Sequence, residues 1–217
     1  MDLKEIEGAE RFIYKSGKTI IAQGQSTENV YYLSGGSCFR TRISEDGNES
    51  VSGIRHSTGT VESVLGLLTV IDGNDSYPSG FVALTECECY RIPAVSFLKY
   101  LNDHVELLYQ IIRFATGEYR SLMEKFNAHS ENSISVFICG LIYELSEPLP
   151  SGKRRLSTEY SNDFLSKLSG VTPVTTARIM SYLKERNIVH RTKNGLIVDD
   201  AESLRDYAEG REMKYRK

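Results

Sequence analysis

The 217-residue sequence lacks any run of about 18 consecutive apolar residues, the length that a membrane-spanning helix requires. It also lacks the features of a secretory signal, because the opening segment MDLKEIEGAERF is acidic and polar. The composition is that of an ordinary globular protein, with 40% apolar and 25% charged residues, and the length allows one large domain or two modest ones. We therefore expect a cytoplasmic protein with no membrane partner.

Cysteine is scarce and is not clustered as metal and redox sites require. Cys38, Cys87, Cys89 and Cys139 are the four present, and the C-x-C pair lacks the C-x₂-C spacing of those sites. The four histidines are scattered along the chain. Cys87 and Cys89 share one face of a strand-like run. We expect buried, inert thiols rather than a metal site or a cofactor.

A catalytic pattern is also missing. We find no nucleophile–base pair, no paired carboxylates in a motif, and no phosphate-loop or dinucleotide fingerprint. Internal repeats and low-complexity tracts are absent from the sequence as well. The sequence therefore predicts a protein that is not an enzyme.

The first half of the chain predicts antiparallel β-structure. Over residues 12–92, short runs rich in β-branched and aromatic residues, such as VYYL (30–33), alternate with turns such as SGGS (34–37) and EDGN (45–48). Regular spacing of this kind is typical of a sandwich or a barrel-like roll. We assign residues 1–101 to this domain.

A long helix is predicted next, after a helical stretch that Pro93 opens, with Asn102 and Asp103 as candidate N-caps. Its apolar seam keeps heptad spacing and consists of Leu101, Val105, Leu108, Ile112, Ala115, Tyr119, Leu122 and Phe126. A second stripe, Leu107, Ile111 and Phe114, is suited to packing on the β-domain. We interpret residues 102–129 as a dimerisation helix whose interface is the seam from Val105 to Phe126. The alternative is a helix buried wholly in its own domain.

The segment after the polar break NAHSEN (127–132) predicts a winged helix-turn-helix over residues 130–217. It reads as helix, basic loop (SGKRR), helix over 162–168, turn, helix over 173–186 and hairpin. Gly170 supplies the turn, and Thr172 is a suitable N-cap before Pro173 at the first helical position. Asn194-Gly195 predicts the tight turn of the hairpin.

Charge is distributed unevenly between the two halves. Residues 1–152 carry a net charge of −8, whereas residues 153–193 carry +6. A basic surface on an acidic body indicates a polyanionic partner, and chance clustering is the alternative.

The second helix of the motif carries the candidate contacts to DNA bases at its exposed N-terminal edge. Arg178 can donate two hydrogen bonds to guanine, and Val174 offers a methyl surface that suits thymine. Hydroxyl groups at this helix start can bind phosphate oxygens. The predicted DNA contacts are Ser161, Asn162, Thr172, Pro173, Val174, Thr175, Arg178, Ser181 and, on the wing, Arg191 and Lys193. The alternatives are a plain surface helix, or a sensor module of the same fold that does not bind DNA.

In order and spacing, these segments resemble the Crp/Fnr family of bacterial transcription regulators over nearly the whole chain. GKTIIAQGQSTENVYYLSGGSCFRTRISEDGNES (17–50) and GFVALTECECYRIP (80–93) resemble its β-roll, and FLSKLSGVTPVTTARIMSYLKERNIV (164–189) resembles its helix-turn-helix. The resemblance implies an α+β fold with an N-terminal antiparallel β-roll, a cyclic-nucleotide-binding-like double-stranded β-helix. A long dimerisation helix and a C-terminal winged helix-turn-helix follow. It also implies a homodimer that binds an inverted-repeat operator in double-stranded DNA, and RNA polymerase as a partner if the protein is an activator.

The sequence departs from this family at the effector site. Sensors of cyclic nucleotides hold the phosphate with a G-E-L and R-S or R-T cassette, and these positions here hold Ser63, Val64, Tyr77 and Pro78. Residues 56–90 contain no Lys or Arg, so a buried phosphate would lack its charge-assisted bonds. The iron–sulfur cysteines of the oxygen-sensing branch are missing too. A Val before the Thr of the recognition helix, and the run SVFICGLIYEL, resemble the branch that senses chlorinated aromatics.

We therefore predict a small-molecule effector that is not a cyclic nucleotide. Its pocket is expected between the roll and the long helix, apolar and aromatic with few polar groups. The candidate residues are Val64, Leu65, Tyr77 and Phe81 of the roll, and Tyr109, Arg113 and Thr116 of the helix. The alternative is a filled core without a pocket.

Overall fold

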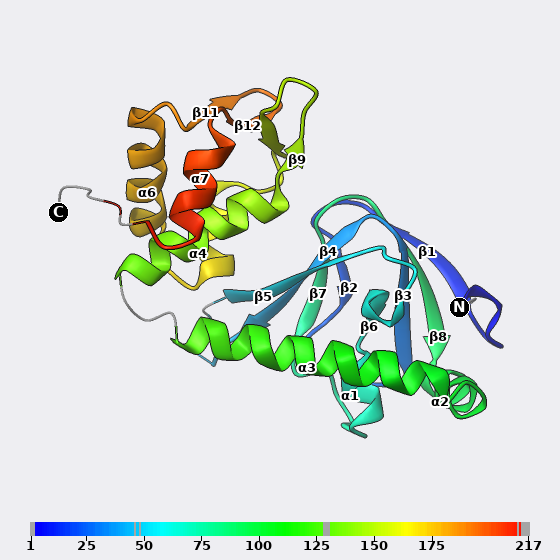
Figure 1. Cartoon of the computed structure of the whole chain (residues 1–217). Helices are drawn as coiled ribbons and strands as arrows, with labels where there is room; N and C mark the ends of the chain where they lie inside the picture. The colour runs from blue at the N-terminus through cyan, green and yellow to red at the C-terminus, as the bar shows by residue number, and fades with distance from the viewer. Residues whose placement is uncertain (1–2, 46, 48, 128–130, 212, 214–217) are drawn as a thin grey trace. The chain divides into compact units, whose positions relative to one another are not determined.

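The computed structural model describes residues 3–45, 47, 49–127, 131–211 and 213. The chain divides into two compact units, residues 1–122 and residues 123–217 (Figure 1). From the sequence, residues 102–129 were predicted to form a segment separate from the β-domain. Most of this segment instead belongs to the same unit as the β-domain. Among the described residues, no helix is long and apolar enough to cross a membrane.

The first unit is built on a β-roll of two four-stranded sheets, with strand orders β1-β8-β3-β6 and β2-β7-β4-β5. The strands are β1 (Glu10–Tyr14), β2 (Thr19–Ile21), β3 (Asn29–Gly35), β4 (Ser37–Ile43), β5 (Glu49–His56), β6 (Val64–Leu65), β7 (Gly80–Ala83) and β8 (Cys87–Pro93). All of their pairings are antiparallel. The predicted roll is therefore confirmed.

The core of the roll lies between the two sheets, because alternate strand residues point inward. Val30, Leu33 and Ile92 have no exposed surface, and they belong to one apolar cluster with the cysteines of β4 and β8. All four cysteines of the chain are buried and free. Burial raises the pKa of the Cys89 thiol, and of the Cys139 thiol in the second unit, to about 12, so both stay protonated and unreactive at neutral pH.

The helical elements of this unit are the 3₁₀ turns η1 (Leu3–Glu5) and η2 (Val61–Ser63), and the helices α1 (Leu67–Ile71), α2 (Ala94–Asp103) and α3 (Glu106–Asn127). Asn102 and Asp103 were predicted to cap α3. Instead, they are the last two residues of α2. Between α2 and α3 the chain makes a turn, in which the backbone N–H of Leu107 donates a hydrogen bond to the carbonyl oxygen of His104. Figure 1 shows α3 lying along the roll.

The second stripe of α3 packs on the roll, as predicted. Leu107 and Ile111 are buried in the core cluster of the roll, and Phe114 packs against it. This contact orients α3, because residues three and four positions apart share one helix face.

The second unit is a winged helix-turn-helix, as predicted. Its helices are α4 (Glu131–Leu145), α5 (Asn162–Ser169), α6 (Pro173–Glu185) and α7 (Ala201–Ala208). Its sheet has the order β11-β12-β10-β9, with β9 (Glu147–Pro148), β10 (Arg154–Leu156), β11 (Val189–Thr192) and β12 (Gly195–Val198). Part of the predicted basic loop is strand β10, and α7, which packs on α4, was not predicted.

The wing depends on the predicted Asn194-Gly195 turn. Gly195 has φ +123°, and a Cβ at this position would lie 2.1 Å from the backbone carbonyl oxygen of Leu156. A residue with a side chain therefore cannot occupy this position while β12 pairs with both β10 and β11.

Candidate DNA interface, seam and effector pocket

Caps at both helices fix the geometry of the helix-turn-helix. The Ser161 hydroxyl accepts a hydrogen bond from the Phe164 N–H at 3.1 Å at the start of α5, and Gly170 ends this helix with φ +70°. At the start of α6, the Thr172 hydroxyl accepts from the Thr175 N–H at 3.2 Å, and Pro173 occupies the first turn. The local sequence signals for this motif thus act where they were expected.

The two faces of α6 have opposite character. Ile179, Tyr182 and Leu183 are buried in the core of the second unit. Val174 is 68% exposed, and Arg178 and Ser181 are exposed on the other face. The guanidinium of Arg178 has no hydrogen-bond or ion-pair partner among the residues that the structure describes. This edge therefore presents one long cation and one apolar side chain outward, beside the start of the helix.

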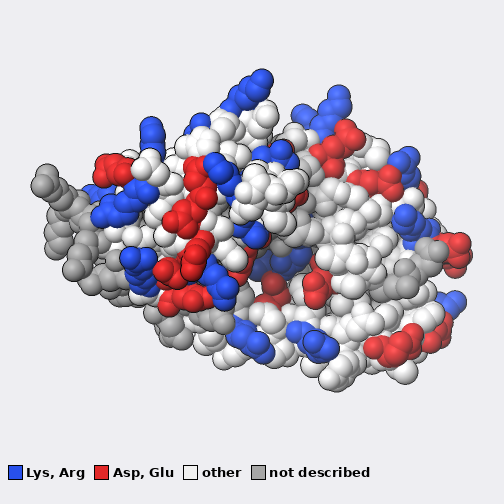
Figure 2. Space-filling view, turned by 45° about the horizontal axis from the view of Figure 1, so that its top comes forward, with Lys and Arg blue, Asp and Glu red and all other residues white. Residues whose placement is uncertain are grey.

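The wing contributes two further exposed cations to the second unit, Arg191 and Lys193. Arg191 on β11 donates a hydrogen bond to the Asn162 side-chain oxygen at 2.9 Å, so two of the predicted DNA contacts bind each other and fix the wing to α5. Lys193, at the tip of the wing, is exposed. In the face that Figure 2 shows, Lys and Arg are interspersed with Asp and Glu, so this face carries no continuous basic patch.

The base of the wing carries a carboxylate between two nitrogen donors. Asp199 bonds to the Lys153 ammonium at 2.6 Å and to the His190 ring. Partial burial acts to raise the pKa of Asp199, but the hydrogen bonds from Lys153 and His190 outweigh it and hold that pKa below its usual value.

The predicted seam of α3 is an apolar stripe on the outside of the first unit. Val105, Leu108, Ile112, Tyr119 and Leu122 are 45–65% exposed, and Ala115 is half-buried. Phe126 lies outside the side chains that the structure describes. The alternative of a helix buried wholly in its own domain is wrong, because these large apolar side chains face solvent.

A cavity of about 80 Å³ lies within the first unit, between the roll and α3. Of the predicted effector residues, Val64, Tyr77 and Phe81 line it, whereas Leu65 is buried in the core. Arg113 lines a second cavity of about 260 Å³ next to the first. Tyr109 and Thr116 are exposed on other faces of α3 and line neither cavity.

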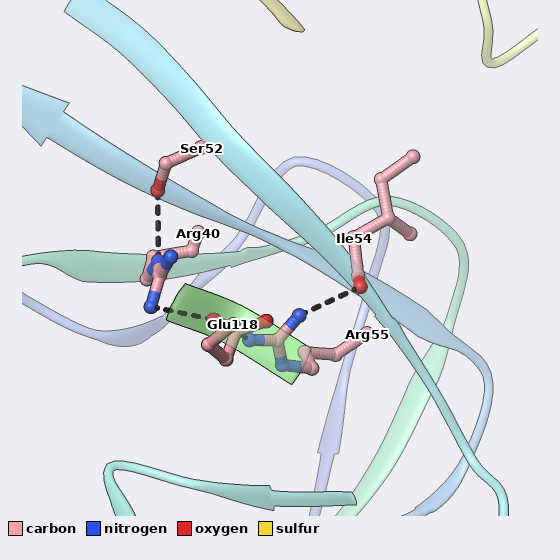
Figure 3. A network of polar contacts seen from close by, with 5 residues as sticks. All are labelled: Arg40, Ser52, Ile54, Arg55 and Glu118. Atoms are coloured by element: carbon pink, nitrogen blue, oxygen red, sulfur yellow. Dashed lines mark hydrogen bonds and ion pairs between the residues drawn. The ribbon is translucent and has the colours of Figure 1, made fainter. Parts of the chain in front are cut away.

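The chemistry of the first cavity differs from the expectation. It was predicted to be apolar with few polar groups, but Arg40 of β4 and Arg55 of β5 both line it. Residues 56–90 hold no cation of their own, and sheet pairing brings these two arginines in from outside that segment. In Figure 3 both guanidinium groups converge on Glu118 of α3. The sequence interpretation missed all three residues.

Tyr77 lies near the position at which the resemblance to the family places the arginine of the cassette. Its ring is buried, and its hydroxyl donates a hydrogen bond to the carbonyl oxygen of Asn29. The ring contacts Gly66, where a Cβ would lie 2.4 Å from it, and the φ of Gly66, +80°, also favours glycine. Burial is the main cause that raises the pKa of Tyr77, so the hydroxyl remains a neutral donor.

Comparison with known proteins agrees with both units. Residues 11–104 match the model of the cyclic nucleotide-binding domain, and residues 138–207 match the Crp-like helix-turn-helix domain. The chain belongs to the Crp/Fnr family of transcription regulators. These are DNA-binding proteins and not enzymes. The name of the first domain describes a shared fold and identifies no ligand for this member of the family.

Relatives and solved structures with similar chains cover nearly the whole protein. The global nitrogen regulator of Synechocystis sp. is 26% identical over 199 residues, which cover 88% of this chain and 85% of the relative. The regulator of the same name from Nostoc sp. is 25% identical over 193 residues, with 85% and 83% covered.

Among solved structures, FixK2 from Bradyrhizobium japonicum has a TM-score of 0.71 at 17% identity, covering 92% of this chain and 96% of its own. CprK complexed with OCPA has a TM-score of 0.62 at 19% identity, with 91% and 88% covered. At these identities the structures show a shared fold.

Proposed function

We propose that the protein is a homodimeric, sequence-specific transcription regulator whose DNA binding is controlled by a small-molecule effector. The exposed edge of α6 carries this proposal, because Arg178 and Val174 extend outward from a helix whose opposite face is buried. In a helix-turn-helix, the N-terminal residues of the second helix contact base edges in the major groove. Arg178 then binds guanine, Val174 contacts a thymine methyl group, and Thr172 and Thr175 bind phosphate oxygens.

Dimerisation follows from the seam of α3. A stripe of five large apolar residues, each 45–65% exposed, has heptad spacing and is suited to a twin helix. A second copy of this chain covers the stripe in our proposal, and a dimer with two recognition helices binds an inverted repeat. Cytoplasmic localisation fits this role, and RNA polymerase is a further partner if the protein activates transcription.

The effector is not a cyclic nucleotide in this proposal. At the cassette positions, the Ser63 hydroxyl bonds to the carbonyl oxygen of His56, and Val64 has no polar group. The buried ring of Tyr77 fills the position of the arginine, and Pro78 has no N–H to donate. A narrower proposal is an effector with an aromatic or other apolar body, as in the branch that senses chlorinated aromatics. The shared fold of CprK complexed with OCPA is compatible with it.

Selection of operator sequences from a random duplex library tests the proposed function. We expect enrichment of an inverted repeat whose half-sites are about one helical turn apart. A library that stays random after selection would contradict DNA recognition and would support the alternative, a sensor module that does not bind DNA. Enrichment of a single half-site would contradict the proposed dimer.

A further inference from the structure

The polar cluster beside the first cavity follows from strand pairing and helix period. On β4 and β5, Arg40 pairs with Gly53 and Cys38 pairs with Arg55, so the two arginines are diagonal neighbours on one face of the sheet. Glu118 continues the inward stripe of α3, seven residues after Ile111 and four after Phe114. A carboxylate thus takes the place of the next apolar residue against the roll.

One carboxylate oxygen of Glu118 binds both cations. It lies 2.6 Å from Nη2 of Arg55 and 3.2 Å from Nη1 of Arg40. Arg40 Nε also donates to the Ser52 hydroxyl at 2.8 Å (Figure 3). The guanidinium of Arg55 lies 5.2 Å from the centre of the Phe114 ring. The Arg55 side chain is only 12% exposed, so this contact is shielded from water more than a surface ion pair is.

The cluster has more positive than negative charge. Two guanidinium groups share a single carboxylate, and the remaining residues of the cavity wall are neutral. Burial is the main cause that lowers the pKa of Arg40, against the opposing effect of Glu118. A further anion that entered the cavity would therefore be attracted to the two arginines, and it would compete with Glu118 for their N–H donors.

The rest of the wall limits what that anion can be. Val64, Leu67, Phe81 and Phe114 give an apolar surface, with Thr69 and Ser79 as small hydroxyl groups. A planar carboxylate can accept hydrogen bonds from a guanidinium fork with both of its oxygens, whereas Glu118 contacts the two arginines through a single oxygen. The cavity is thus suited to a carboxylate on a small apolar body rather than to a bulky phosphate ester.

We infer that this cavity binds a small organic carboxylate, and that Glu118 is its internal competitor, which holds α3 on the roll until the ligand takes over the two arginines. Glu118 directly precedes Tyr119 and lies one turn before Leu122, both in the exposed seam. Ligand binding weakens the attachment of α3 to the roll at this point and thereby shifts the population of seam arrangements. This last step rests on the proposed function, whereas ligand binding in the cavity does not.

The test uses the full-length protein and two probes, benzoate and butyrate, with benzamide as the uncharged analogue of benzoate. Calorimetry should show millimolar or tighter binding of a carboxylate probe and none of benzamide. Glu118→Gln removes the competitor and should tighten carboxylate binding about tenfold or more, since a charge-assisted bond no longer has to be exchanged. Arg55→Gln should weaken it by a similar factor.

Matched controls come from the exposed ion pair between Arg91 and Glu10, which lines neither cavity. Glu10→Gln and Arg91→Gln remove the same charges from the surface of the first unit, and both should leave carboxylate affinity unchanged. Thermal unfolding separates this role from a purely structural one. Glu118→Gln should unfold at a lower temperature without ligand, and a bound carboxylate should restore its stability. If Glu118→Gln does not fold, Glu118→Asp keeps the charge but shortens its reach, and it should also bind the probes more tightly.

Three results would overturn the inference. They are the absence of binding by both carboxylates to the wild type and the Gln variant, equal binding of benzoate and benzamide, and weaker carboxylate binding in the Gln variant. Fluorescence anisotropy with the selected operator measures DNA binding separately from carboxylate binding. Sequence-specific DNA binding with no carboxylate binding leaves the regulator standing and rejects only the ligand class.

Discussion

Removal of the Arg178 side chain is the most direct perturbation of the proposed recognition helix. Arg178 is exposed and lies at the sixth residue of α6, on the face opposite the buried Ile179 and Leu183. Since it has no partner among the described residues, Arg178→Ala should leave the fold of the second unit intact. A fall in DNA affinity can then be attributed to the missing guanidinium group at the bases.

The expected magnitude comes from a bidentate arginine–guanine pair. Each pair contributes about 1–3 kcal/mol, so two half-sites together lose about 2–6 kcal/mol, or roughly 30-fold to 10⁴-fold in Kd. The loss should fall on one base position per half-site. At that position the variant should accept all four bases with similar affinity, while preferences elsewhere in the operator persist.

Anisotropy titrations on the selected operator and on its single-base variants measure this effect. Arg178→Lys keeps the charge but not the fork, so it should recover part of the affinity and little of the base preference. Lys184→Ala is the matched control, because it removes an exposed cation from the last turn of the same helix, away from the N-terminal edge. If Arg178→Ala keeps every base preference of the wild type, our assignment of the recognition helix is wrong.

Four further predictions address the wing, the seam, the pocket and the stability of the second unit. Lys193→Ala should weaken binding to all DNA sequences and lower the salt slope by about 0.9 for each phosphate that the lysine neutralises, as measured by titrations at several salt concentrations. Leu108→Asp with Ile112→Asp should give monomers in sedimentation, because it places like charges against each other in the seam; an unchanged dimer would exclude the seam as the interface. Calorimetry with cyclic AMP and cyclic GMP at millimolar concentration should show no binding, and micromolar affinity for either would refute this assignment of the pocket. Asp199, whose folded pKa is lowered, should stabilise the protein above the unfolded pKa of about 3.9 and lose that effect as pH falls through the folded value. Asp199→Asn should therefore be destabilising in unfolding experiments at neutral pH, by an amount that declines in acid.

Local signals made most of the fold predictable from the sequence. The capping hydroxyl of Thr172, the turn at Gly170 and the Asn194-Gly195 hairpin each act within a few residues of themselves, and all lie where they were expected. Elements that depend on distant partners were missed. Strand β10 has only three residues and forms because it pairs with β12 and β9 at either side, so its own sequence carries no strand period.

The candidate base contacts could be predicted from the sequence because Val174 and Arg178 both lie on α6, and side chains of one helix follow a known period. The pocket needs the correct placement of four strands, β4, β5, β6 and β7, and of two helices, α1 and α3. Register depends on the turns and bulges of the whole roll, including the irregularity between Arg40 and Thr41. One signal was present in the sequence: Glu118 continues an inward apolar stripe, and a carboxylate at such a position requires a cation from an element that packs against it.

The two arginines also change the reason for expecting no cyclic nucleotide. The absence of Lys and Arg from residues 56–90 does not leave the cavity without cations, because β4 and β5 supply them from outside that segment. Tyr77 now gives the main reason, because its buried ring lies near the position that the resemblance assigns to the cassette arginine, and its hydroxyl donates a hydrogen bond to the carbonyl oxygen of Asn29. A nucleotide phosphate at that position would have to displace the ring into the core of the roll. The two arginines lie instead on β4 and β5, where both contact Glu118 of α3, and there the structure favours a ligand that competes with Glu118.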